Sequence, residues 1–162
     1  MIIISDDKIK EYISELKIIP KNFNITFKDK GCGHMQFNHY LTGENGNTFY
    51  IGIRESKFNP SDFSVIFGVK INGKVFILAR YNGNHGEHTN KIDNKSMEGS
   101  HIHRATKIYQ ERGFEEEAHA EKTAKYSDWR TALKLLYNEN NFELETAKDQ
   151  KRITQIWKAK QS

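Results

Sequence analysis

The chain has few residues that form disulfides or interrupt regular secondary structure: it contains one cysteine and two prolines among its 162 residues. A single cysteine, Cys32, cannot form an internal disulfide, which favours a reducing compartment. The apolar stretch after Met1 is short and no basic residues precede it, so it does not indicate a secretory signal peptide. We therefore expect a cytoplasmic protein.

Long apolar runs are missing as well. No segment approaches the roughly 20 apolar residues that a membrane-spanning helix needs, so no membrane partner is expected. The phosphate-binding glycine loop and the Gly-x-Ser-x-Gly motif are also absent, which leaves P-loop and α/β-hydrolase functions unsupported. The net charge of +4 permits a polyanionic partner without requiring one. The length fits one domain spanning residues 1–162.

The hydrophobic pattern predicts an α+β fold. Ser5 is placed to cap a helix that ends before Pro20, and the apolar period then changes from helical to alternating. We expect an antiparallel meander of about five strands followed by C-terminal helices. The expected strands lie near residues 23–27, 35–41, 49–53, 63–71 and 75–81, and the expected helices near 115–126, 127–137 and 144–157.

The hairpin around Asn72-Gly73 is the clearest of these elements, because this dipeptide favours a two-residue type I′ turn. An unbroken register from that turn pairs Phe67 with Leu78 and Val65 with Arg80. Arg80 would then lie on the apolar face. After this hairpin the periodic pattern is lost from residue 83 to about 113, which predicts a long loop.

Four of the seven histidines fall in that loop: His85, His88, His101 and His103. Histidine both transfers protons near neutral pH and binds metals. The leading interpretation is metal-independent RNA cleavage, which needs a proton acceptor, a proton donor and a cation for the phosphate. His85 or His88 would act with His101 or His103 as the proton pair, and Arg80 would supply the cation. The nucleic-acid contacts would come from Arg104, Lys107, Tyr81 and Tyr109.

Two other interpretations of the histidines stay open. The same four imidazoles could bind a metal, although the short zinc signatures with cysteines or a helical His-x3-His are absent. Alternatively, the histidines only satisfy backbone groups in a glycine-rich loop. The leading interpretation expects no metal and no cofactor.

Segments of the chain resemble an uncharacterised bacterial domain family. The resemblance is carried by residues 63–67, 78–90, 101–106 and 126–129, and spans residues 60 to 140. It implies no established activity, so no catalytic residue follows from it. The element order is also similar, at the level of the fold, to small toxin ribonucleases of the RelE and barnase type. Substantial helix after the sheet departs from that type.

The expected function is therefore that of an RNA-directed protein, an endoribonuclease of a bacterial toxin–antitoxin or phage-defence system. RNA is the expected substrate, and a cognate antitoxin or other protein is a possible partner. The alternative is a non-enzymatic binding protein, such as a phage-borne inhibitor, that uses the histidine-rich loop as a recognition surface.

Overall fold

The computed structural model describes residues 2–146, 149 and 158, and it confirms an α+β fold. The helices are α1 (Asp6–Ser14), α2 (Lys107–Glu111) and α3 (Trp129–Glu139). The strands are β1 (Lys17–Ile19), β2 (Lys28–Asp29), β3 (His34–Thr42), β4 (Thr48–Ser56), β5 (Phe63–Ile71), β6 (Lys74–Asn82), β7 (His88–Thr89), β8 (Ser96–Met97), β9 (His101–Arg104), β10 (His119–Lys122) and β11 (Phe142–Leu144). None of the helices in the described part of the chain has the length and apolar character needed to cross a membrane.

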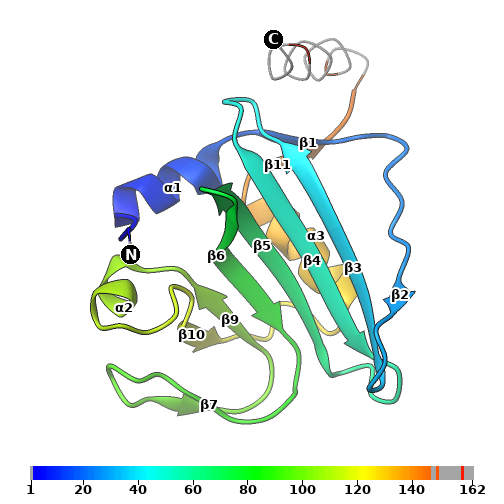
Figure 1. Ribbon diagram of the computed structural model, residues 1–162. Coiled ribbons are helices and arrows are strands. Elements are labelled where there is room, and N and C mark those ends of the chain that lie inside the picture. The colour runs from blue at the N-terminus through cyan, green and yellow to red at the C-terminus, as the bar shows by residue number, and fades with distance from the viewer. Residues whose placement is uncertain (1, 147–148, 150–157, 159–162) are drawn as a thin grey trace.

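A seven-stranded antiparallel sheet dominates the structure, in the order β10-β9-β6-β5-β4-β3-β2 (Figure 1). Four of the five expected strands are present as β3 to β6, and β9 and β10 extend them at one edge. The strand expected near residues 23–27 is absent, and only the two-residue β2 follows that segment. Strands β7 and β8 form a separate two-stranded hairpin, and β1 pairs in parallel with β11. The segment from 83 to 113, predicted as a loop, therefore contains three short strands and one short helix.

One face of the sheet forms the hydrophobic core with α3, which packs against β5 and β6. Helix α3 begins at Asp128, whose carboxylate accepts from the backbone of Thr131 in a capping box. Its apolar side then buries Leu136, which is 0% exposed. The alternating residues Phe49, Ile51 and Phe67 meet it from the strands. The alternation that predicted the strands thus reflects a sheet covered on one side.

The opposite side, which we call the open face, is polar. Directly paired residues of antiparallel strands share a face, so the register assigns each side chain to one side. In the described part of the chain, Figure 1 shows α3 behind β4 and β5 and no helix in front of them. One row of the open face runs through Lys28, Gln36, Arg54, Ser64, Asn82, His101 and Lys122, and the next through Asn38, Gly52, Ile66, Arg80, His103 and Ala120.

The predicted register of the β5–β6 hairpin is correct near the turn and wrong beyond it. Val69 does pair with Phe76, but an irregularity between Phe67 and Gly68 adds one residue to β6. Phe67 consequently pairs with Ala79, and Arg80 pairs with Ile66. A shift of one residue moves every following side chain to the other face. Arg80 therefore lies on the open face, where it pairs with His103 of β9.

The predicted arrangement of helices is also corrected. The segment 115–126, expected as a helix, contains β10, because pairing with β9 outweighs its weak helical preference. The helix expected at 127–137 is α3. The helix expected at 144–157 lies largely outside the described residues, and its first residues belong to β11 or follow it.

Gly83 directly follows the end of β6 and begins the segment that contains His85 and His88. A Cβ atom at this position would stand 2.1 Å from the carbonyl oxygen of Ser61 and 2.6 Å from the ring of Phe63. We expect Gly83→Ala to lower the free energy of unfolding by about 1–3 kcal/mol, because backbone must move to relieve the clash. Chemical denaturation measures this change, with the exposed neighbour Asn84→Ala as control. Equal stability of the two variants would contradict the proposed close contact.

Candidate functional site

Strand β9 presents two histidines on the open face. His101 and His103 are two residues apart and so point to the same side of the strand. Both are nearly inaccessible, at 2% and 8% exposed. Their neighbours across the β6–β9 pairing are Asn82 and Arg80. The short strand that sequence analysis placed in a loop is thus the platform of the site.

A third histidine reaches this pair from the β7–β8 hairpin. The ring of His88 stacks on that of His101, with centroids 5.5 Å apart and an interplanar angle of 17°. It meets His103 edge-on at 4.6 Å. One ligating nitrogen from each of the three residues lies within 4.8 Å of the others. We call His88, His101 and His103 the histidine cluster.

Hydrogen bonds to the backbone set the tautomers of the two buried rings. Nδ1 of His101 lies 2.8 Å from the carbonyl oxygen of Gly99, and Nδ1 of His103 lies 2.9 Å from that of Glu117. A carbonyl only accepts, so each Nδ1 carries the proton and donates. Each Nε2 therefore has a lone pair. That of His101 faces the amide nitrogen Nδ2 of Asn82, 3.5 Å away, which donates a long hydrogen bond to it. Metal-binding histidines characteristically donate their other N–H group in this way.

The ring of His88 is oriented by Asn90. Asn90 is 1% exposed and pairs twice with the backbone of Ala120: its Nδ2 donates to the carbonyl oxygen, and its Oδ1 accepts from the N–H group. That pairing fixes which atom of the amide is the oxygen. Oδ1 also lies 3.1 Å from Nε2 of His88, which must therefore be the donor. The free lone pair of His88 is on Nδ1, so each histidine of the cluster has one ring nitrogen without a proton, and that of His101 is shared with the amide of Asn82.

The two β9 histidines are neutral at physiological pH. Burial lowers the pKa of His101, with a further contribution from His88 and an opposing one from the bond to Gly99. Burial, followed by repulsion from His101 and His88, lowers the pKa of His103 to about 3. A neutral imidazole can accept a proton or bind a metal, but it cannot act as a general acid.

The cluster has the composition of an open metal site. Imidazole is a good ligand for zinc, and three protein ligands with a free fourth position are typical of catalytic zinc. Bonds of about 2.0–2.1 Å in a tetrahedral site place ligand nitrogens roughly 3.3 Å apart. Nitrogens up to 4.8 Å apart must therefore approach one another by roughly 1.5 Å to bind an ion. The ring of exposed His85 is 5.8 Å from that of His101, outside the cluster.

Arg80 is the cation beside the cluster, as the sequence predicted, although it reaches there by the opposite face of its strand. Its Nη2 donates to Oε1 of Glu117 at 2.7 Å. The Glu117 side chain is 6% exposed, and its Oε2 is buried without a hydrogen-bond partner among the described residues. The side chain of Arg80 remains 32% exposed, so it can also contact an incoming anion.

The four predicted nucleic-acid contacts do not join the cluster. Tyr81 and Tyr109 are 0% and 3% exposed, so neither ring has a face open to a base. Arg104 lies on the core side of β9 and pairs with Glu139, 3.0 Å away. Lys107 is on α2, where it pairs with Glu111. The proposed stacking role of the two tyrosines is corrected, since they are core residues.

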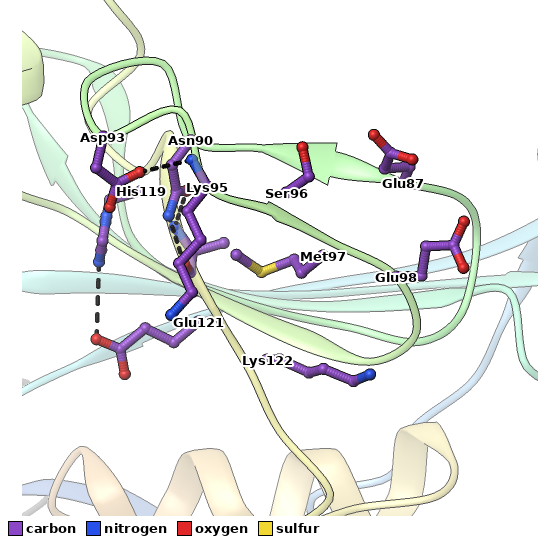
Figure 2. A pocket seen from close by; sticks show the side chains of 11 residues that line it. Glu87, Asn90, Asp93, Lys95, Ser96, Met97, Glu98, His119, Glu121 and Lys122 are labelled. Atoms are coloured by element: carbon purple, nitrogen blue, oxygen red, sulfur yellow. Dashed lines mark hydrogen bonds and ion pairs between the residues drawn. The ribbon is translucent and has the colours of Figure 1, made fainter.

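A cleft of about 760 Å³ lies beside the site, between the β7–β8 hairpin and β10 (Figure 2). Its lining includes Asn90 but none of the cluster histidines. Four carboxylates line it, from Glu87, Asp93, Glu98 and Glu121, against the two lysines Lys95 and Lys122. Because acids outnumber cations there, the cleft is poorly suited to a phosphate. The open face is the better approach to the cluster.

Acid should destabilise the metal-free protein through His103. A base whose pKa is lower in the folded chain binds fewer protons when folded. The free energy of unfolding therefore falls as the pH drops from about 6.5, the usual pKa of an unfolded histidine, towards 3. We expect His103→Gln to flatten this pH dependence of the free energy of unfolding. Thermal melts of chelator-treated protein at several pH values measure it. The exposed residue His85→Gln is the control, and equal slopes in wild type and His103→Gln would contradict the assignment.

Comparisons of the chain with protein-family models, with curated proteins and with solved structures found no match. The resemblances to a bacterial domain family and to toxin ribonucleases remain predictions. Sequence reasoning found all three cluster histidines and Arg80, but it missed Asn90 and Glu117. Asn90 follows His88 by two residues, and this closeness in the sequence was the one sign that its side chain could contact His88. Glu117 lies in a segment expected as a helix, and nothing in the sequence pointed to it.

Proposed function

We propose that the chain is a metal-dependent phosphodiesterase acting on RNA, with zinc held by the histidine cluster. The observation that supports this most directly is the set of three convergent imidazoles, each with its second nitrogen engaged by an acceptor. Such acceptors orient ligand rings and make them more basic. A purely structural role would not require one nitrogen from each of three imidazoles to lie within 4.8 Å of the others.

The chemistry of this site differs from the acid–base mechanism expected from the sequence. That mechanism needs one protonated imidazole, and the lowered pKa values of His101 and His103 remove two of the four candidates. That leaves His85 and His88 as the candidate acids. A zinc ion held by the cluster would instead supply a water whose pKa is lowered to about 7 and would polarise a phosphoryl oxygen, so no protonated imidazole would be needed.

Arg80 supplies the second cation. Its guanidinium is held by Glu117 on the same face as His103 and is partly exposed. Arginine matches the geometry of phosphate and stays charged at every relevant pH. In this proposal Arg80 holds a phosphate against the ion. The histidines of β9 would hold the ion, and His88 would complete the site from strand β7 of the β7–β8 hairpin.

Incubation with labelled single-stranded RNA and DNA tests the proposal. The protein is compared as purified, after EDTA treatment, and after zinc is restored. We expect RNA cleavage that EDTA abolishes and zinc restores, and at least about 100-fold slower cleavage by zinc-treated His101→Ala. Cleavage that survives EDTA would replace this mechanism with metal-independent proton transfer. A folded, zinc-loaded protein without cleavage would favour the non-enzymatic binding protein.

The cellular role that fits such an activity is a toxin of a toxin–antitoxin or phage-defence system. An RNA-cleaving protein is toxic when it is expressed without its inhibitor. We expect induction of the wild-type chain to arrest bacterial growth and the His101→Ala variant to relieve the arrest. The exposed histidine variant His85→Ala serves as control, because His85 lies outside the cluster. Equal growth of wild type and His101→Ala would contradict this role.

A further inference from the structure

The open face carries two aromatic rings that the core does not explain. Tyr40 of β3 and Tyr50 of β4 are paired neighbours on this face, with ring centroids 5.3 Å apart. Tyr40 is 48% exposed. Nζ of Lys70 lies 5.5 Å from the centre of its ring. Large aromatic side chains usually serve a core or a binding partner, and these two face away from the core.

Gly52 allows Tyr50 to lie across the sheet. A Cβ atom at Gly52 would stand 2.3 Å from the hydroxyl oxygen of Tyr50 and 2.8 Å from the nearest atom of its ring. The hydroxyl donates to Oδ1 of Asn38 on the neighbouring strand, which holds the ring in this position. A ring that is held before binding loses little conformational entropy when a ligand stacks on it.

The charge of the open face has one sign at its paired positions. Five cationic side chains occupy them: Lys28, Arg54, Lys70, Arg80 and Lys122. In the two rows described above and at the pairs Tyr40–Tyr50 and Lys70–Val75, no position is aspartate or glutamate. Arg54 pairs with Asp62 and Arg80 with Glu117, both from loops, and each arginine side chain is still about a third exposed. The face therefore complements a polyanion.

The aromatic pair and the histidine cluster lie at two ends of one surface. β3 and β9 are separated by three strands in the sheet order. Four spacings of about 4.8 Å give roughly 19 Å, a span of a few nucleotides. Beside Tyr40 on β3, the exposed amide of Asn38 can bond base edges and ribose hydroxyls.

We propose that the open face binds single-stranded RNA, with bases stacked on Tyr40 and Tyr50 and phosphates on the cationic side chains of this face, up to Arg80 beside the histidine cluster. A flat sheet with exposed rings suits unpaired bases, whereas a duplex hides the faces of its bases. This inference deepens the proposed function by defining its substrate. RNA binding itself does not require the ion, so the two proposals can fail separately.

Fluorescence anisotropy with a labelled mixed-sequence single-stranded RNA tests the surface, in EDTA so that no cleavage occurs. Loss of stacking by one base costs about 1–3 kcal/mol, equivalent to about a 5- to 150-fold weaker affinity. We expect Tyr40→Ala to weaken binding by that factor and Tyr40→Phe to retain it. Lys70→Gln should reduce the slope of log affinity against log salt concentration by about the amount that one phosphate contact contributes. Phe58→Ala is the matched control, because Phe58 is an exposed aromatic outside the open face, at 84% exposed.

Four outcomes would overturn the inference. They are wild-type protein that does not bind the RNA, a Tyr40→Ala variant that binds as tightly as wild type, a Phe58→Ala variant that is equally impaired, and duplex RNA that binds better than single strands. Thermal melts of each variant show whether it is folded. RNA binding without zinc-dependent cleavage would support the surface and contradict the proposed activity. Zinc-dependent cleavage of a small phosphodiester without RNA binding would do the reverse.

Discussion

Alanine at His103 is expected to weaken zinc binding by at least about 100-fold. His103 is one of three proposed ligands, and its ring is restrained because it is buried and donates to the carbonyl oxygen of Glu117. Removing it leaves two imidazoles and an incomplete coordination shell. Competition against a coloured zinc chelator measures the affinity. His101→Ala should have a similar effect, since both residues stand on β9.

Two other histidines provide the controls for this experiment. His39→Ala changes a residue of β3 that packs against Phe23 and Phe37, away from the cluster. His85→Ala changes an exposed neighbour whose ring is 5.8 Å from His101. We expect both variants to retain zinc affinity within a few-fold. An affinity that fell equally in all the histidine variants would show non-specific binding, and an unchanged affinity in His103→Ala would remove this residue from the site.

Asn90→Ala is expected to weaken zinc binding by about 10- to 100-fold without removing a ligand. Loss of a partner that orients a ligating histidine typically has this effect. Asn90 is the acceptor for Nε2–H of His88 and also joins the β7–β8 hairpin to β10 through both hydrogen bonds with Ala120. The variant leaves both Ala120 groups without their partner, so the free energy of unfolding should fall by about 1–3 kcal/mol. Zinc competition and denaturation measure the two effects.

Ser96→Ala is the matched control for Asn90→Ala, because it removes a hydroxyl group of the same hairpin that bonds Thr89 at the surface. We expect it to change neither quantity appreciably. Normal zinc affinity in a folded Asn90→Ala protein would contradict the role of Asn90 in orienting His88. A loss of stability in the absence of zinc, with normal affinity at saturation, would limit Asn90 to holding the hairpin.

Local patterns in the sequence predicted much of the sheet. The alternation of β3 to β6 and the Asn72-Gly73 turn are consequences of a sheet with one buried face, and the structure has both. The N-terminal helix begins where Ser5 caps it. The edge strands were not predictable in the same way. β9 and β10 are four residues each, and β10 forms because β9 offers it a partner, a fact that lies far away in the sequence.

The candidate site was found only in part, for an identifiable reason. Counting histidines was sufficient to locate the cluster, because residues such as His101 and His103 share a face in any extended strand. The side of Arg80 could not be found, since it depends on one extra residue at Phe67 and Gly68. The burial of Tyr81 was hidden for the same reason. Two of the partners that set the tautomers, Gly99 and Asn90, are only two residues from the histidines they bond, whereas Glu117 comes from the turn before β10 and no local pattern points to it.

A zinc titration of the metal-free wild-type protein by calorimetry, alongside the triple variant His88→Ala, His101→Ala, His103→Ala, tests the histidine cluster most directly. We expect one ion to bind per wild-type chain with submicromolar affinity and no comparable binding to a folded triple variant. Binding releases few protons at pH 7 if these imidazoles are already neutral, as the lowered pKa values of His101 and His103 indicate. Wild-type protein that binds no zinc, or binds it as well as the triple variant does, would contradict the metal centre.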